Sequence, residues 1–170
     1  MIFDLDPGPG IQPGDLVEAL NLLHTLLDDV DLESFLKTTG GKGFHVVVPL
    51  ERRASWDEVR AFARRVAEHM VRTNPDLLVS RMEKARRRNK IFVDYLRNAR
   101  GATAVSPYST RARPGAPVSV PVPWEDLSED VSPDELTLEN VSSFPKDPWP
   151  GFFEVHQWLS KKRRQRLGLT

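Results

Sequence analysis

Three aspartates have the types and spacing that divalent-metal chemistry requires. Asp4 and Asp6 lie two residues apart in IFDLDP, which alternates as a strand does, so their side chains leave the same face. Asp94 lies in the apolar run KIFVDYL, where an unpaired carboxylate is costly to bury. If neighbouring strands bring the three together, their oxygens favour Mg²⁺ or Mn²⁺ over zinc. Strand-end capping plus a salt bridge to an arginine is the alternative.

A glycine-rich segment, TTGGKG, ends at Gly43 and contains one lysine. Backbone N–H groups at Gly40 and Gly41 can approach an anion closely, and Lys42 adds a positive charge beside them. The spacing is not that of a Walker loop, and an ordinary hairpin turn would give a similar pattern. His45 follows in the run FHVVVPL, where it could donate to phosphate oxygens or fill a structural role.

Basic residues surround the third aspartate in the sequence. They are Arg86, Arg87, Arg88 and Lys90 before it, and Arg97, Arg111 and Arg113 after it. Metal–triphosphate chemistry needs a metal for the reacting oxygens and cations for the remaining phosphate charge. These features together predict nucleotidyl transfer from a metal-bound nucleoside triphosphate. A second basic run, KKRRQR near the C-terminus, fits a solvated surface equally well.

Periodicity and capping signals predict the elements that position these residues. Strands are expected at the N-terminal IFDLDP and over residues 32–39, 44–50, 90–96 and 102–109, and helices over 15–29 and 56–72. Asp15 with Glu18, and Ser55 with Glu58, are the expected capping pairs. Residues 113–150 are proline-rich and predict a surface segment, and 149–167 predict a C-terminal amphipathic helix. This order predicts an α+β fold with helices packed on one mixed β-sheet.

The composition is that of one globular domain spanning residues 1–170, with 24 basic and 24 acidic residues and therefore no net charge. A neutral total predicts no nucleic-acid partner by itself, although local charge clusters permit an anion site. Cysteine is absent, which excludes disulfides and fits the cytoplasm. No apolar run reaches the ~18 residues of a membrane span, so no membrane association is expected.

Three segments closely resemble, in order, the polymerase domain of bacterial DNA ligase D, within the archaeo-eukaryotic primase superfamily. They are IFDLDPGPG, KTTGGKGFHVVVPL and IFVDYLRNARGATAVSPYSTRARPGAPVSVPVPW. The likeness runs from Ile2 to about Trp158. It implies a primase-polymerase catalytic core with an RRM-like sheet. The family's D-x-D pair corresponds to Asp4 and Asp6 and its third metal-binding aspartate to Asp94, and all three are implied to be catalytic.

The resemblance also implies which residues bind the nucleotide. The family motif that contacts the triphosphate corresponds to Thr39, Gly40, Gly41, Lys42 and His45, with threonine where serine is usual. Basic positions that contact phosphates in the family resemble Arg87 and Arg111, with Arg97 near the same site. The implied reaction is attack of a primer 3′-hydroxyl on the α-phosphate of an NTP or dNTP, with two Mn²⁺ or Mg²⁺ ions.

The family implies a role in non-homologous end joining, with DNA ends or a primer–template as substrate and Ku and a DNA ligase as partners. It also implies a bacterial, nucleoid-associated protein. In the family, roughly half of the polymerase domain precedes the D-x-D strand. That half holds the base-stacking aromatic and the lysines for a 5′-phosphate, and here Met1 lies three residues before Asp4. We therefore expect the catalytic part of the domain, with a separate N-terminal half as a further partner.

Two other functions remain open from the sequence. One is a non-catalytic nucleotide- or DNA-binding unit that needs the N-terminal half. The other is a phosphatase with Asp4 as nucleophile, as in haloacid-dehalogenase-like enzymes, although Pro7-Gly8 fits that family's motif poorly.

Overall fold

The computed structural model describes residues 1–83, 87–141 and 147–169. Its strands are β1 (Ile2–Pro7), β2 (Phe35–Thr38), β3 (Phe44–Val47), β4 (Leu78–Val79), β5 (Ile91–Asp94) and β6 (Pro121–Val122), and its helices are α1 (Pro13–Asp29), α2 (Trp56–Thr73) and α3 (Lys161–Arg166). The strands form one sheet in the order β4-β5-β1-β3-β2-β6. All neighbours are antiparallel except β4 and β5. The predicted α+β fold with a mixed sheet is confirmed.

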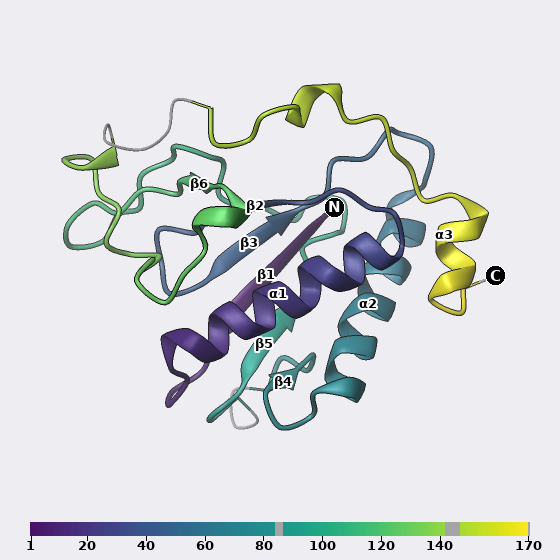
Figure 1. Ribbon diagram of the computed structural model, residues 1–170, viewed down its shortest axis with the longest axis horizontal. Helices are drawn as coiled ribbons and strands as arrows, with labels where there is room; N and C mark the ends of the chain where they lie inside the picture. The colour runs from purple at the N-terminus through teal and green to yellow at the C-terminus, as the bar shows by residue number, and fades with distance from the viewer. Residues whose placement is uncertain (84–86, 142–146, 170) are drawn as a thin grey trace.

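The two faces of the sheet are chemically different because side chains alternate along each strand. Phe3 and Leu5 of β1 point to one face and are fully buried with residues of α1 and α2. Both helices lie across this face (Figure 1). Asp4 and Asp6 therefore point to the opposite face. The hydrophobic core thus holds the strands in place, and the polar residues lie on the side that α1 and α2 leave uncovered.

The long helices begin where their caps place them. Ser55 Oγ accepts from the Glu58 N–H, and Glu58 accepts from the Ser55 N–H at 2.8 Å, so the predicted capping box of α2 is confirmed. The cap of α1 differs from the prediction. Asp15 is not the N-cap but accepts from the Gln12 N–H at 2.8 Å, and Pro13 suits the first helical turn. The helix therefore starts two residues earlier.

The predicted C-terminal helix over 149–167 is wrong, since α3 covers Lys161–Arg166 and Phe152–Glu154 form a single 3₁₀ turn. Gly151 has φ +78°, which interrupts a right-handed helix. Trp149 Nε1 donates to the Leu36 carbonyl of β2. Gln157 bonds the backbone of Glu33 and Pro49. Contacts with the sheet and the loops beside it thus hold this segment extended.

The proline-rich segment 113–150 is also only partly at the surface. Val118, Val120 and Val122 are at most 1% exposed, and β6 pairs with β2 as an edge strand, a position that tolerates Pro121. Residues 142–146 lie outside the described residues. The predicted strand over 102–109 does not form, and this stretch is irregular. Among the described residues, no helix is long and apolar enough to span a membrane.

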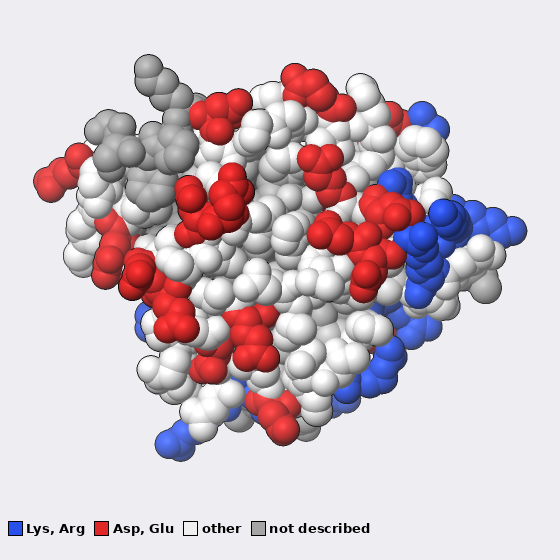
Figure 2. Space-filling model, viewed as in Figure 1, with Lys and Arg blue, Asp and Glu red and all other residues white. Residues whose placement is uncertain are grey.

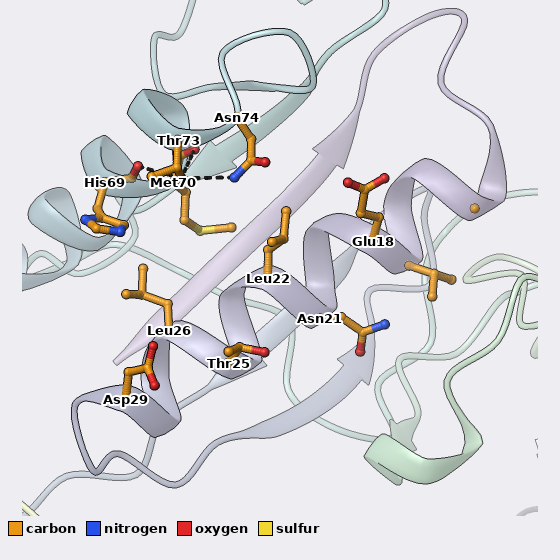
Figure 3. A pocket seen from close by; sticks show the side chains of 12 residues that line it. Glu18, Asn21, Leu22, Thr25, Leu26, Asp29, His69, Met70, Thr73 and Asn74 are labelled. Carbon is orange, nitrogen blue, oxygen red and sulfur yellow. Dashed lines mark hydrogen bonds between the residues drawn. The ribbon is translucent and has the colours of Figure 1, made fainter.

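The helical side of the molecule carries a groove between α1 and α2 (Figure 3). Leu22, Leu26 and Met70 line it together with Glu18 and His69. It lies on the side of the helices, away from the three aspartates, so it contributes nothing to their chemistry.

Candidate functional site

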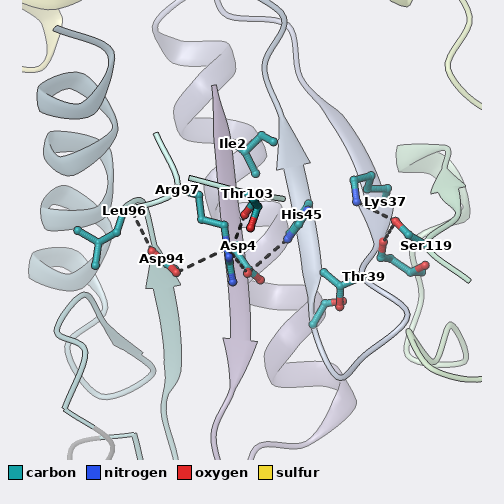
Figure 4. A network of polar contacts seen from close by, with 12 residues as sticks. Ile2, Asp4, Lys37, Thr39, His45, Asp94, Leu96, Arg97, Thr103 and Ser119 are labelled. Carbon is teal, nitrogen blue, oxygen red and sulfur yellow. Dashed lines mark hydrogen bonds and ion pairs between the residues drawn. The ribbon is translucent and has the colours of Figure 1, made fainter. Parts of the chain in front are cut away.

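Strand register places four chemically active side chains in one row across the polar face of the sheet. Asp94 of β5 pairs with Asp4 of β1, Asp4 pairs with His45 of β3, and His45 pairs with Lys37 of β2. Directly paired residues in antiparallel strands project to the same face with Cβ atoms ~5 Å apart. Figure 4 shows this row. The predicted convergence of Asp4 and Asp94 from neighbouring strands is therefore observed.

Asp4 is the centre of this row and is 4% exposed. Its Oδ2 lies 3.3 Å from His45 Nε2 and accepts from Arg97 Nε at 3.0 Å. Burial opposes its ionisation, but the hydrogen bond and charge from His45, together with Arg97, outweigh burial and lower the pKa of the Asp4 carboxyl. Its Oδ1 is buried and has no hydrogen-bond partner. One oxygen of the central carboxylate is therefore free to bind a further cation.

The other two aspartates are shifted in the opposite direction. Burial, followed by the charge of Asp4, raises the pKa of Asp6. Burial also raises the pKa of Asp94, although Asp94 Oδ1 accepts from the Leu96 N–H at 2.7 Å. Burial is the largest cause of both raised pKa values, and the negative charge of Asp4 adds to it. The cluster is therefore a place where additional positive charge is stabilising.

Arg97 supplies part of that positive charge. Its Nε lies 3.0 Å from Asp4 Oδ2 and 3.9 Å from Asp94 Oδ2. The Thr103 carbonyl helps to orient it, because it accepts from Arg97 Nη1 at 3.0 Å. Within the ranges that the structure describes, no three His, Asp or Glu side chains are grouped closely enough to hold a metal ion. The oxygen donors suit Mn²⁺ or Mg²⁺, but Arg97 occupies the space between two of them.

The glycine loop connects β2 to β3 beside the aspartates. Thr39 Oγ1 donates to the Gly43 carbonyl at 2.9 Å, so this hydroxyl fixes the shape of the loop. Gly40 has φ +61°, which favours glycine. A Cβ on Gly43 would lie 2.2 Å from the Leu5 carbonyl oxygen. The glycines are therefore required by the backbone path and by the close approach of the loop to β1.

Asp4, Asp6 and the glycine loop line one cleft of about 340 Å³, which we call the polar cleft. Asp94 pairs with Asp4 in register but does not line this cleft. Its lining residues are Asp4, Asp6, Thr39, Gly41, Lys42, His45, Arg97, Thr103, Val105, Arg111 and Arg113. Arg111 Nη1 donates to the Thr39 carbonyl at 2.9 Å, which ties the arginine to the loop. The cleft therefore has carboxylates on its floor and four basic side chains around it.

Not every predicted residue reaches this cleft. The guanidinium of Arg87 stacks on the Phe92 ring at 3.9 Å and donates to the Met82 carbonyl, and Arg87 does not line the cleft. Phe92 pairs with Asp6 in register, so Arg87 remains close enough for its charge to offset part of the rise that burial causes in the pKa of Asp6. Arg86 lies outside the described residues.

Sequence reasoning missed two contributors. Lys37 is 1% exposed and donates to Ser119 Oγ at 2.8 Å. Its period-2 spacing to Thr39 could have signalled that it shares a face with the predicted site. Arg113 was named as one of the flanking cations but was not assigned to the site, although it lines the cleft.

The chain is similar in sequence to known proteins of one family. The family model for the LigD primase-polymerase domain matches residues 1–149. Relatives include the multifunctional non-homologous end joining protein LigD of Pseudomonas aeruginosa, 43% identical over 98% of this chain and 20% of the relative. The bifunctional non-homologous end joining protein LigD of Bacillus subtilis is 30% identical over 92% of this chain and 26% of the relative. The chain thus spans about a fifth to a quarter of these relatives.

A solved structure is similar over most of the fold. The polymerase domain of Mycobacterium tuberculosis ligase D, determined in complex with DNA, superposes with a TM-score of 0.77 at 33% identity. The match covers 86% of this chain and 53% of that chain.

Proposed function

Because the chain belongs to the family of LigD primase-polymerase domains, we propose that it acts in nucleotidyl transfer to DNA ends during non-homologous end joining. The observation that carries the proposal is the polar cleft, which combines Asp4 and Asp6 with the glycine loop and basic side chains. Asp94, the register partner of Asp4, lies beside it. Carboxylates for metals beside cations for phosphates are the parts that phosphoryl-transfer sites require.

The residues divide into two groups by charge. Asp4, Asp6 and Asp94 would hold Mn²⁺ or Mg²⁺, with the free Asp4 Oδ1 as one ligand atom. When bound, such ions lower the pKa of an attacking 3′-hydroxyl and offset the charge that develops on the α-phosphate. Arg97, which bonds Asp4, is the side chain that a bound metal would displace from this carboxylate, and its guanidinium would then be available to a phosphate oxygen.

The basic wall of the cleft neutralises the triphosphate. Lys42, Arg111 and Arg113 lie around the cleft, and Arg111 is held in place by the Thr39 carbonyl. Gly41 exposes backbone to the same space. His45, buried against Asp4, orients that carboxylate more directly than it contacts phosphate. The incoming nucleotide is an NTP or dNTP, and the acceptor is a DNA primer end.

The same proposal implies partner proteins. The relatives are named as multifunctional or bifunctional end-joining proteins, and this chain spans about half of the solved polymerase-domain chain. Ku, a DNA ligase and the remaining half of a polymerase domain are therefore the proposed partners, at bacterial DNA.

The test is metal-dependent nucleotide binding to the purified chain. Mn²⁺ is titrated with a fluorescent ATP analogue against the wild type, Asp94→Asn and Asp76→Asn. We expect Asp94→Asn to weaken Mn²⁺-dependent binding at least about tenfold, because it removes one charged ligand. Asp76 is exposed away from the cleft, so Asp76→Asn controls for the loss of one negative charge.

A second candidate is a unit that binds nucleotide or DNA without metal. The position of Arg97 between Asp4 and Asp94 favours it, because the arginine already neutralises two of the acids. Equal nucleotide binding by wild type and Asp94→Asn, with or without Mn²⁺, would select this candidate and reject the catalytic one.

A further inference from the structure

A second cleft on the polar face of the sheet lies directly beside the polar cleft. It has a volume of about 530 Å³, and we call it the aromatic cleft. Ile2, Lys37 and Val47 form its floor, and Val105 lines both clefts. Ile2 precedes Asp4 by two residues and Val47 follows His45 by two, so these two floor residues lie ~7 Å along the strands from the aspartate row, and Lys37 is the end of the row itself. Figure 4 shows Ile2 and Lys37 on this face.

The walls of this cleft are aromatic. Trp149 and Phe152 stack with ring centroids 4.9 Å apart. Phe153, which contacts Phe152 edge-on, is 91% exposed, and Tyr108 is 54% exposed. All four side chains line the cleft. Exposed aromatic faces around a cavity of this size provide a surface on which a flat ring can stack.

The charges around the cleft restrict what such a ring can be. Asp147 and Glu154 belong to the lining, and both are exposed, so a phosphate group in this cleft would be repelled. Lys37 lies in the floor, 1% exposed, and donates a hydrogen bond to Ser119 Oγ. A purely apolar occupant would add to the desolvation of this cation without offering it any acceptor. A neutral ring with both donors and acceptors satisfies both conditions.

We propose that the aromatic cleft binds a nucleobase of a single nucleic-acid strand, adjacent to the polar cleft. The proposal rests on the proposed function, because the shared Val105 wall puts the base within one nucleotide's length of the aspartates. Base–aromatic stacking tolerates any sequence and binds single strands in this way elsewhere. The strand's phosphates would then run past the arginines of the polar cleft, and only the base would enter between Tyr108 and Trp149.

Photocrosslinking with a single-stranded DNA tetranucleotide that carries 5-iodouracil, in EDTA, tests the location. Irradiation joins this base to an aromatic ring in contact with it, and peptide mapping identifies the residue. We expect crosslinks at Tyr108, Trp149 or Phe153. Crosslinks elsewhere, or none, would overturn the proposal.

Matched variants test the energetics by fluorescence anisotropy with the same tetranucleotide. Phe153→Ala and Tyr108→Ala are each expected to weaken binding about tenfold. Trp56→Ala is the control, because Trp56 is 55% exposed but does not line this cleft. If all three variants bound the tetranucleotide as tightly as the wild type, or if all three lost the same affinity, the aromatic cleft would not be the nucleobase site. Since Phe153 is almost fully exposed, its replacement leaves the core intact.

The two proposals fail separately. If the tetranucleotide binds at the aromatic cleft but Mn²⁺-dependent ATP binding is absent, the nucleobase site stands and the catalytic proposal falls. If ATP binding depends on Mn²⁺ and Asp94 while tetranucleotide binding ignores Phe153 and Tyr108, only the nucleobase site is rejected.

Discussion

At the scale of single residues, the polar face contains buried charged and polar groups whose hydrogen-bonding capacity is not fully used. Among the described residues, Asp4 Oδ1 and His45 Nδ1 are buried without a hydrogen-bond partner, and the buried Lys37 ammonium donates to the neutral Ser119 hydroxyl. Buried polar groups of this kind cost free energy. A sequence selected for stability alone would place apolar side chains here, so the row points to ligand binding.

Arg97 competes with metal for Asp4 and Asp94. We expect Arg97→Gln to raise the affinity of the chain for Mn²⁺ alone by about fivefold, since the variant removes the cation that a metal must displace from Asp4. Isothermal titration without nucleotide measures the affinity. The same variant should bind Mn²⁺–ATP less well than its Mn²⁺ affinity predicts, because a phosphate partner is lost. A lower affinity for Mn²⁺ alone would contradict the competition.

Because Lys37 is buried, we expect the free energy of unfolding to change with pH in the alkaline range. Burial lowers the pKa of Lys37 from 10.5 to about 8, opposed by the charge of Asp4. Between these values the unfolded chain binds more protons than the folded chain, so the free energy of unfolding rises with pH. Between pH 8 and 10.5, the free energy of unfolding of the wild type should rise by up to roughly 3 kcal/mol relative to that of Lys37→Met. Urea unfolding of both proteins at several pH values measures this difference. If the free energies of unfolding of the two proteins changed with pH in parallel, the pKa of Lys37 would not be lowered.

At the scale of elements, the β2–β3 loop and β1 are fitted to one another. Gly43→Ala places a Cβ 2.2 Å from a backbone oxygen of β1, whereas a Cβ at Gly41 first meets side-chain atoms at 3.2 Å. We expect Gly43→Ala to lower the free energy of unfolding by more than about 2 kcal/mol and Gly41→Ala by less than about 1 kcal/mol. Denaturant unfolding compares them, and similar values for both would show that the loop can move away from β1.

Local signals account for what the sequence predicted at this scale. Alternation around Asp4 and Asp6, and the apolar run before Asp94, identified β1 and β5, and the Ser55 capping box identified α2. The pairing of the strands could not be predicted from such local signals, because register depends on contacts between distant segments. Residues 149–160 were misread for a related reason: their amphipathic pattern serves contacts to the sheet and its adjoining loops through Trp149 and Gln157.

At the scale of the whole molecule, charge separates the faces. Figure 2 shows acidic side chains scattered over the side that bears α1, with Lys and Arg gathered at the edge near α3. A nucleic-acid strand is repelled by such an acidic surface. The basic side chains of the polar cleft lie on the other side of the sheet, so an anionic ligand would reach them only from that direction.

The basic helix α3 serves to attach the chain end to the helical layer. Arg164 Nη1 bonds Glu58, Arg166 Nη1 bonds the Asp29 carbonyl, and Arg163 Nη2 bonds the Asp31 carbonyl. We expect Arg164→Gln with Arg166→Gln to lower the free energy of unfolding by about 1 kcal/mol and to leave Mn²⁺–ATP affinity unchanged. Thermal unfolding and the ATP titration check both parts. A loss of ATP affinity would place α3 in the site.

The row Asp94–Asp4–His45–Lys37 also bears on how the gene can change in length. Each of four strands contributes one member, so an inserted or deleted codon within any of them turns its residue toward the core and removes it from the row. We therefore expect insertions and deletions to be tolerated only between the strands, where they leave the register of all four strands unchanged.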